Sequence, residues 1–160
     1  MDMQTTGGPK DVDRYRTFLK VGLPGPHAYT VLLGLEYFDL PNVLKAVEKG
    51  FPFKAFERLM HNMGVPSDRL AEIVGIPRRT LARRKIEKRF TSEESERLLR
   101  GARVFANTLR LFDGNREDAV EWLLTLQRDL GKAPADLIHT ETGTREVERV
   151  IGALEHGVFL

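Results

Sequence analysis

The side chains best suited to chemistry in this chain are arginines and lysines that cluster in one short stretch. Residues 78–89, RRTLARRKIEKR, hold seven basic residues and one acidic residue, a local charge of +6, although the whole chain carries only +2. Guanidinium groups can pair with the edge of guanine, and cations of either kind bind phosphates. The cluster therefore predicts a DNA partner; the alternative is a solvated basic face on a helical hairpin.

The residues just before and within this cluster predict the elements that would present it. In VPSDRLAEIVGIPRRTLARRK (65–85), Leu70 and Val74 lie four residues apart, as on one face of a helix, and Gly75 suits a left-handed turn. Two short helices joined in this way are typical of a helix-turn-helix. Further residues fit the pattern: Ser67 as helix cap, Ala71 as the small residue where the helices approach, Ile76 and Leu81 as core, and Pro77 as helix start.

Seven residues of the second helix and its end are the expected DNA contacts. Those at the N-terminal and outward part of the helix would reach base edges, and the cations that follow would bind phosphates. The seven are Arg78, Arg79, Thr80, Arg83, Arg84, Lys85 and Lys88, with Arg89 as a further phosphate ligand. Because the glycine, small and apolar positions all agree with the motif, DNA binding is favoured over the solvated face.

Other kinds of site find little support in the sequence. The chain has no cysteine, and its four histidines (27, 61, 139 and 156) show no metal-ligand spacing, so we expect no metal and no cofactor. There is no Gly-rich phosphate loop and no nucleophile beside a plausible base. The carboxylates of Glu117, Asp118 and Glu121 fit an exposed helix start. We therefore do not expect an enzyme.

The last third of the chain has the opposite charge and predicts a second partner. Residues 113–160 hold five basic and ten acidic residues, a local charge of −5, and the only tryptophan, Trp122. Taken alone, Trp122 is better explained as core, but an acidic helical surface also suits a basic partner. The apolar end, Gly157 to Leu160, could fold back on the chain or enter a partner's pocket, and the residues leave both alternatives open.

The remaining pattern predicts an all-α protein. Apolar residues at helical spacing, 98, 102, 105, 109 and 112, form either a core stripe or a dimerisation seam, after a capping box of Thr91 and Glu94. Residues 29–35 could be a strand or a buried helical turn. Helices are expected at 11–21, 42–49, 53–62, 92–112 and 116–130, the last capped by Asn115 and followed by Gly131. A short helix is expected near Pro134, and a final helix from a Thr144 cap to Gly157, with Leu154 inward.

The expected organisation has three parts: residues 1–41, a tail and helical extension; 42–96, the helix-turn-helix region; and 97–160, a helical domain for dimerisation and for the second partner, which the resemblance given next makes a toxin-binding domain. The first ten residues read as a mobile tail. The role of residues 1–41 stays open between packing on the helix-turn-helix, dimerisation and DNA contact. Because no apolar run reaches membrane-spanning length and no signal peptide is evident, we expect a cytoplasmic protein.

The order of these motifs resembles the Xre-type antitoxins of RES-domain toxin–antitoxin operons. The resemblance begins near Asn42 and rests on four blocks: GIPRRTLARRK (75–85), SEESERLLRGARVF (92–105), AVEWLLTLQRDLGKAPADLI (119–138) and TETGTREVERVIGALEHGVF (140–159). It implies a homodimeric antitoxin that binds its own promoter and a RES-fold toxin acting on NAD. One departure is Leu126-Gln127-Arg128, where relatives often carry a proline-containing turn, and it suggests a longer helix there.

The resulting hypothesis is an autorepressing antitoxin that neutralises an NAD-consuming or ADP-ribosylating toxin. By this resemblance, the C-terminal end would block the toxin's NAD pocket, and the toxin-binding residues would be Trp122, Glu155, His156, Gly157, Val158, Phe159 and Leu160. The alternative is a stand-alone helix-turn-helix regulator with a C-terminal ligand-sensing or dimerisation domain.

Overall fold

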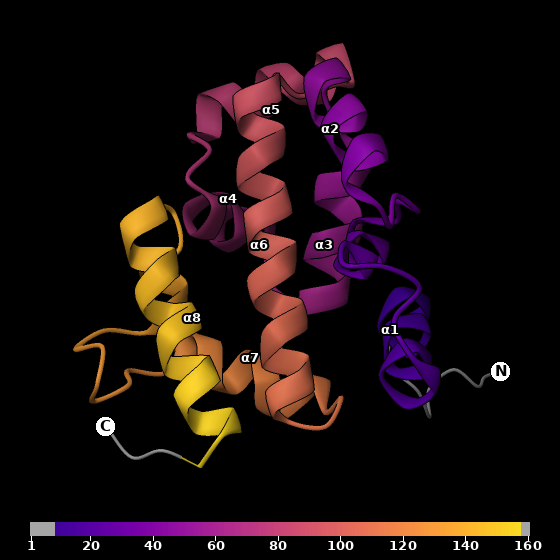
Figure 1. Ribbon diagram of the computed structural model, residues 1–160. Coiled ribbons are helices and arrows are strands. Elements are labelled where there is room, and N and C mark those ends of the chain that lie inside the picture. Colours follow the sequence, from indigo (N-terminus) through magenta and orange to yellow (C-terminus); the bar gives the residue numbers. More distant parts are fainter. Residues whose placement is uncertain (1–8, 158–160) are drawn as a thin grey trace, which may run out of the picture.

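The computed structural model describes residues 9–157, which fold into helices joined by turns (Figure 1). Within that range there is no β-strand, only two isolated bridges that pair Pro52 with Arg89 and Gln127 with Lys132. The all-α prediction is confirmed. The predicted mobile tail lies mostly outside the described residues, since α1 (Lys10–Val21) begins at the second of them.

A long central helix, α6 (Ser92–Leu111), organises the fold and runs through the middle of the molecule in Figure 1. Its predicted capping box is present: Glu94 N donates to Thr91 Oγ1, and Thr91 N donates to Glu94 Oε1. The apolar stripe is core rather than a seam, because Leu98, Phe105 and Leu109 have no exposed surface within the single chain. Phe112, one turn later, is only half-buried.

Residues 10–41 pack against the rest of the chain. The 3₁₀-helix η2 (Ala28–Leu33) is buried along its whole length, which decides between the strand and the helical turn expected there. It contacts α1, α3 (Lys54–Met63) and α6. The buried carboxylate of Asp11 accepts hydrogen bonds from Arg58 Nε (2.8 Å) and Asn62 Nδ2 (2.9 Å). This polar contact fixes α1 on α3, while α2 (Leu40–Lys49) packs on α6.

The helix expected over residues 116–130 is shorter than predicted: α7 is Arg116–Leu124. The predicted cap at its start is confirmed, since Asn115 Oδ1 accepts from Asp118 N at 3.0 Å. At its end, Gln127 Nε2 donates to the carbonyls of Trp122 (3.1 Å) and Thr125 (3.0 Å), and so replaces the amides of a further helical turn. The suggested lengthening at 126–128 is therefore wrong, and the chain turns there into a loop that stands out from the helices in Figure 1.

The last elements are η3 (Pro134–Asp136) and α8 (Glu141–Glu155). The cap of α8 is Thr140, not Thr144 as predicted, and its side chain accepts from Gly143 N at 3.0 Å. Thr144 instead lies buried in the first turn of α8, where its hydroxyl donates to the carbonyls of Ile138 and Thr140. Leu154 is 41% exposed, against the expected inward position, since it lies near the end of the helix. No helix in the described range is both long and apolar enough to cross a membrane.

Candidate nucleic-acid interface and C-terminal surface

The predicted helix-turn-helix is formed by α4 (Ser67–Val74) and α5 (Arg78–Glu87). The core positions are as predicted, with Leu70, Ile76 and Leu81 each at most 8% exposed. Ser67 is not the cap that was expected, because Pro66 occupies that position and no side chain caps the helix. Ser67 instead opens the first turn, and Pro77 directly precedes α5.

The turn between the two helices is held by α6. Gly75 has φ 76° and ψ 33°, the left-handed conformation that the sequence predicted. Its carbonyl accepts a hydrogen bond from Arg97 on α6 at 3.1 Å. Behind the turn, a Cβ on Gly101 of α6 would lie 3.1 Å from a methyl group of Val74, so a glycine there permits the close crossing of α4 and α6. The long helix thereby fixes the orientation of α5.

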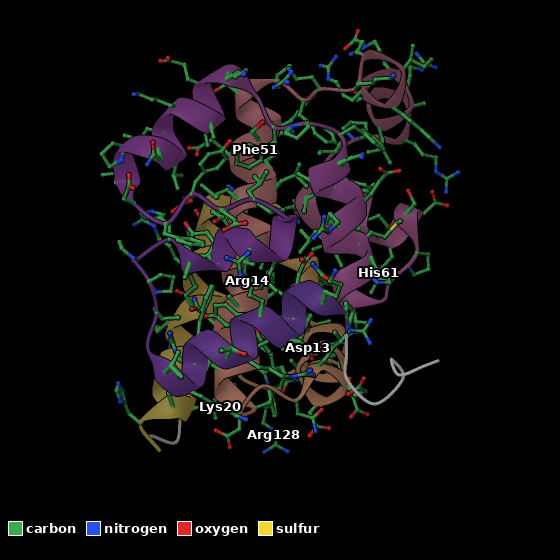
Figure 2. All side chains as sticks on the ribbon, turned by 90° about the vertical axis from the view of Figure 1, so that its right-hand side faces the viewer. Asp13, Arg14, Lys20, Phe51, His61 and Arg128 are labelled. Atoms are coloured by element: carbon green, nitrogen blue, oxygen red, sulfur yellow. The ribbon has the colours of Figure 1, made fainter. Side chains whose placement is uncertain are left out.

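Four cations of the α5 region are available to a ligand. Each is exposed, and no ion pair or side-chain hydrogen bond holds it within the described range 9–157: Arg79, Arg83, Lys85 and Lys88. Arg89 is also exposed and makes no ion pair there, but its Nη1 donates to the carbonyl of Gly50. Figure 2 shows nitrogen-tipped side chains around this helix at the upper right of the molecule. Thr80 is half-buried beside them. An exposed row of uncompensated cations on the second helix is the arrangement that binds a phosphate backbone and base edges.

Arg84 does not lie outward with its neighbours, contrary to prediction. Its guanidinium donates to both carboxylate oxygens of Glu94, at 2.7 and 3.0 Å, and to Glu87 at 2.9 Å. Its side chain is only 14% exposed. The hydrogen bonds that Arg84 donates to Glu94 and Glu87 raise the pKa of Arg84 above its ordinary value. Burial alone would raise the pKa of Glu94, but the bonds from Arg84 and Thr91 outweigh burial and lower it. Arg84 therefore anchors α5 to the start of α6.

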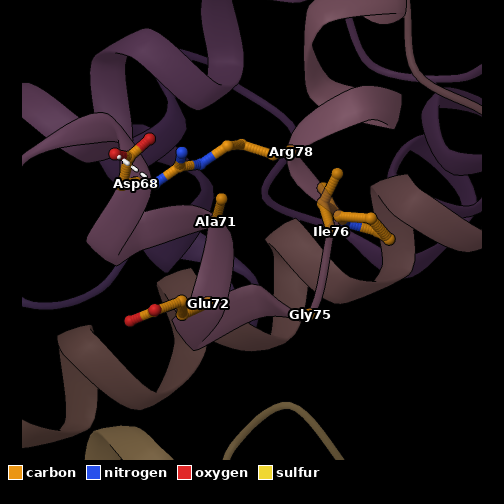
Figure 3. Close-up of a pocket in the computed structure, with 7 residues that line it drawn as sticks. Asp68, Ala71, Glu72, Gly75, Ile76 and Arg78 are labelled. Carbon is orange, nitrogen blue, oxygen red and sulfur yellow. Dashed lines mark hydrogen bonds and ion pairs between the residues drawn. The ribbon is translucent and has the colours of Figure 1, made fainter.

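Arg78, at the start of α5, is exposed like Arg83 but makes an ion pair like Arg84. Its Nη2 donates to Asp68 Oδ2 on α4 at 2.7 Å, as Figure 3 shows, and both side chains are largely exposed. The pair borders a shallow cleft between the two helices that is also lined by Ala71 and Ile76. An exposed pair of this kind is weak, so Arg78 can exchange Asp68 for a phosphate or a base at little cost.

The C-terminal elements are held against α6 by arginines spaced along its length. Arg103 binds Glu148 through two hydrogen bonds of 2.7 and 3.2 Å, and Arg110 binds Glu155 in the same way at 2.6 and 3.1 Å. The hydrogen bonds that Arg110 donates to Glu155 raise the pKa of Arg110. Arg100 donates to the carbonyls of Ile138 and His139 before α8. None of these three arginines was singled out by the sequence, because their partners lie some 40 residues away.

The described residues among those predicted to bind a toxin come from α7 and from the end of α8. Trp122 is half-buried on α7 against Phe112, with ring centroids 6.5 Å apart. Glu155 is occupied by Arg110 at the end of α8, and His156 and Gly157 are exposed beyond it. Val158, Phe159 and Leu160 lie outside the described residues. Their predicted role stays a prediction.

The fold and the exposed cations define a helix-turn-helix protein with an appended C-terminal helical region, and comparison with known families gives the same division. Residues 43–103 match the antitoxin Xre-like helix-turn-helix domain. Residues 108–157 match the antitoxin Xre/MbcA/ParS C-terminal toxin-binding domain. The chain belongs to the family of Xre antitoxins, which is not an enzyme family. The two matches meet inside α6, which continues unbroken through both.

Two relatives named Antitoxin Xre support this membership. The chain is 38% identical over 119 residues to Antitoxin Xre of Yersinia enterocolitica, an alignment that covers 73% of this chain and 80% of the relative. It is 30% identical over 120 residues to Antitoxin Xre of Photorhabdus laumondii, covering 74% and 81%. The domain matches begin at residue 43, so α1 and η2 lie outside them.

Proposed function

We propose that this protein is a cytoplasmic type II antitoxin that binds and neutralises a RES-domain toxin and represses its own operon. The observation that carries the proposal is the joining of two surfaces by one helix. The exposed cations of α5 and the toxin-binding family region are both positioned by arginines of α6. An antitoxin built in this way can control its own supply through one surface and its partner through the other.

The proposed DNA half rests on the free cations of α5 and on Arg78. A homodimer would place two such helices on successive major-groove half-sites about one helical turn apart. We expect the double variant Arg79→Ala, Arg83→Ala to weaken binding to the operon's own promoter in a gel-shift assay. Unchanged binding by a folded double variant would remove α5 as the recognition helix.

The proposed toxin half places the partner on the C-terminal region, with residues 155–160 blocking an NAD pocket of the toxin. The ion pair of Arg110 and Glu155 fixes the last residue of α8 on α6. Co-purification with the product of the adjacent reading frame tests binding. Deletion of residues 157–160 tests the blocking role, and we expect the truncated chain to keep its melting temperature but to lose protection of cells. A truncated chain that still protects would contradict the role of the tail.

The second candidate is a stand-alone transcriptional regulator. It would use the same α5 surface and the C-terminal helices for ligand sensing or dimerisation. A short RES-domain reading frame beside the gene favours the antitoxin, and its absence together with intact promoter binding favours the regulator.

A further inference from the structure

A surface pocket at the C-terminal end of α7 has a chemistry that the DNA-binding surface does not share. It has a volume of about 280 Å³. Its lining combines two aromatic rings, two carboxylates and two further polar side chains: Phe112, Trp122, Asp118, Glu121, Thr125 and Gln127. All six lie within residues 108–157, the part that matches the toxin-binding domain.

The aromatic part of the pocket is a pair of rings, one from the residue that follows α6 and one from α7. The rings of Phe112 and Trp122 are inclined at 53°, and both side chains are half-buried, so each keeps part of its surface accessible. The face of a tryptophan ring is the strongest aromatic binder of a cation.

The carboxylates beside the rings have no cation of their own. Within residues 9–157, Asp118 and Glu121 are exposed and form no ion pair. Glu117, on the same helix, differs because Arg116 lies 3.5 Å from it. Arg128 follows the pocket in sequence but is directed outward at the lower edge of Figure 2. The pocket therefore holds uncompensated negative charge next to accessible ring surface.

The hydrogen-bond donors of Gln127 and Thr125 at the edge of the pocket are already used within the chain. Both hydrogens of the Gln127 amide are used, in bonds to the carbonyls of Trp122 and Thr125. The hydroxyl of Thr125 donates to the carbonyl of Glu121 at 2.6 Å. Apart from the indole N–H of Trp122, the side-chain polar atoms left for a ligand are hydrogen-bond acceptors, and two of the groups are carboxylates. A group that carries donors and positive charge therefore fits better than an anion.

We propose that this pocket receives an arginine side chain of the toxin. A guanidinium is planar, stacks on aromatic rings and offers several donors to carboxylates, which a lysine ammonium cannot do together. Leu124 and Leu126 stand on either side of Thr125 in the sequence and are 37% and 65% exposed, so they offer apolar surface that a protein partner, rather than a free cation, would cover. The inference rests on the proposed function, because it names a contact of the same C-terminal region.

The test compares two neutralising variants of one helix. Glu121→Gln removes a pocket charge, and Glu117→Gln removes the same charge outside the pocket; both residues are exposed, so neither change should affect folding. We expect Glu121→Gln to weaken the complex with the operon's toxin about 10-fold by calorimetry, as for loss of one charged contact. Glu117→Gln should stay within about twofold, the range of a rim charge. Equal affinities for the two variants would overturn the proposal.

A second measurement separates the pocket from the proposed function. Trp122 is the only tryptophan, so its fluorescence reports on this pocket alone. We expect N-acetyl-arginine amide to change it saturably, and the uncharged citrulline analogue to have no such effect. The response should be lost in Glu121→Gln. If the toxin fails to bind the unmodified chain, the proposed function is wrong, whereas a response that is equal in Glu121→Gln or equal for citrulline overturns the pocket.

Discussion

Arg83 and Arg84 are neighbours on α5, and we predict that replacing each by methionine impairs a different property of the protein. Methionine keeps the length and much of the apolar stem of the side chain but removes the charge. Arg83 is exposed and makes no ion pair within the described range, whereas Arg84 is bound by Glu94 and Glu87. Arg83→Met should therefore affect DNA binding, and Arg84→Met should affect the folded state.

The magnitudes follow from what each substitution leaves behind. Arg84→Met leaves Glu94, a side chain only 9% exposed, without its cation, although Thr91 N still donates to it at 2.9 Å. Removing one partner of a buried pair strands the other charge, so we expect the melting temperature to fall by roughly 6–12 °C for a chain of this size. Arg83→Met loses one DNA contact, which should weaken binding about 10-fold and, for a phosphate contact, lower the salt slope by about 0.9.

Thermal unfolding by circular dichroism and promoter binding by fluorescence anisotropy at several salt concentrations measure the two effects separately. Binding is compared at a temperature well below the melting point of either variant. The reasoning is refuted if Arg84→Met unfolds at the temperature of the unmodified chain and yet loses DNA affinity. It is also refuted if Arg83→Met binds promoter DNA with unchanged affinity and salt slope.

Asp68→Asn should strengthen promoter binding by up to about fivefold in the same anisotropy assay, because Arg78 then has no ion pair with Asp68 to give up when it binds DNA. Weaker binding would mean that Asp68 positions Arg78 for DNA. Leu109→Ala should cost about 2–5 kcal/mol of unfolding free energy in urea, and separate transitions for the two halves would contradict a core shared through α6. The lowered pKa of Glu94 stabilises the fold at neutral pH, and this contribution is lost as pH falls below about 4.5 through that lowered value. The urea midpoint of Glu94→Gln should therefore fall less steeply as the pH is lowered than that of the unmodified chain. The same pH dependence in both chains would show that Glu94 does not contribute to the loss of stability in acid.

Much of the local structure could be predicted from the residues themselves. The left-handed turn at Gly75, the capping box of Thr91 and Glu94 and the cap at Asn115 all form as expected. Each depends on side-chain and backbone groups within a few residues of one another, so the chain needs no distant partner to specify it. One failure, the length of α7, is also local. Gln127 ends α7 by bonding back to two carbonyls, and a helical pattern of apolar residues does not reveal that competition.

The sequence by itself determined that this is an all-α protein with a helix-turn-helix, a basic cluster and an acidic C-terminal third, since composition, capping residues and helical spacing are local properties. Only the tertiary structure decided which cations are available. Glu94 lies ten residues beyond Arg84 and takes it out of the basic face, while Arg79 and Arg83 stay free. In the same way, Asp118 and Glu121 became a pocket only when Phe112 was brought against Trp122. Charge can be counted along the chain, but its availability to a partner depends on which opposite charges the fold brings within bonding distance.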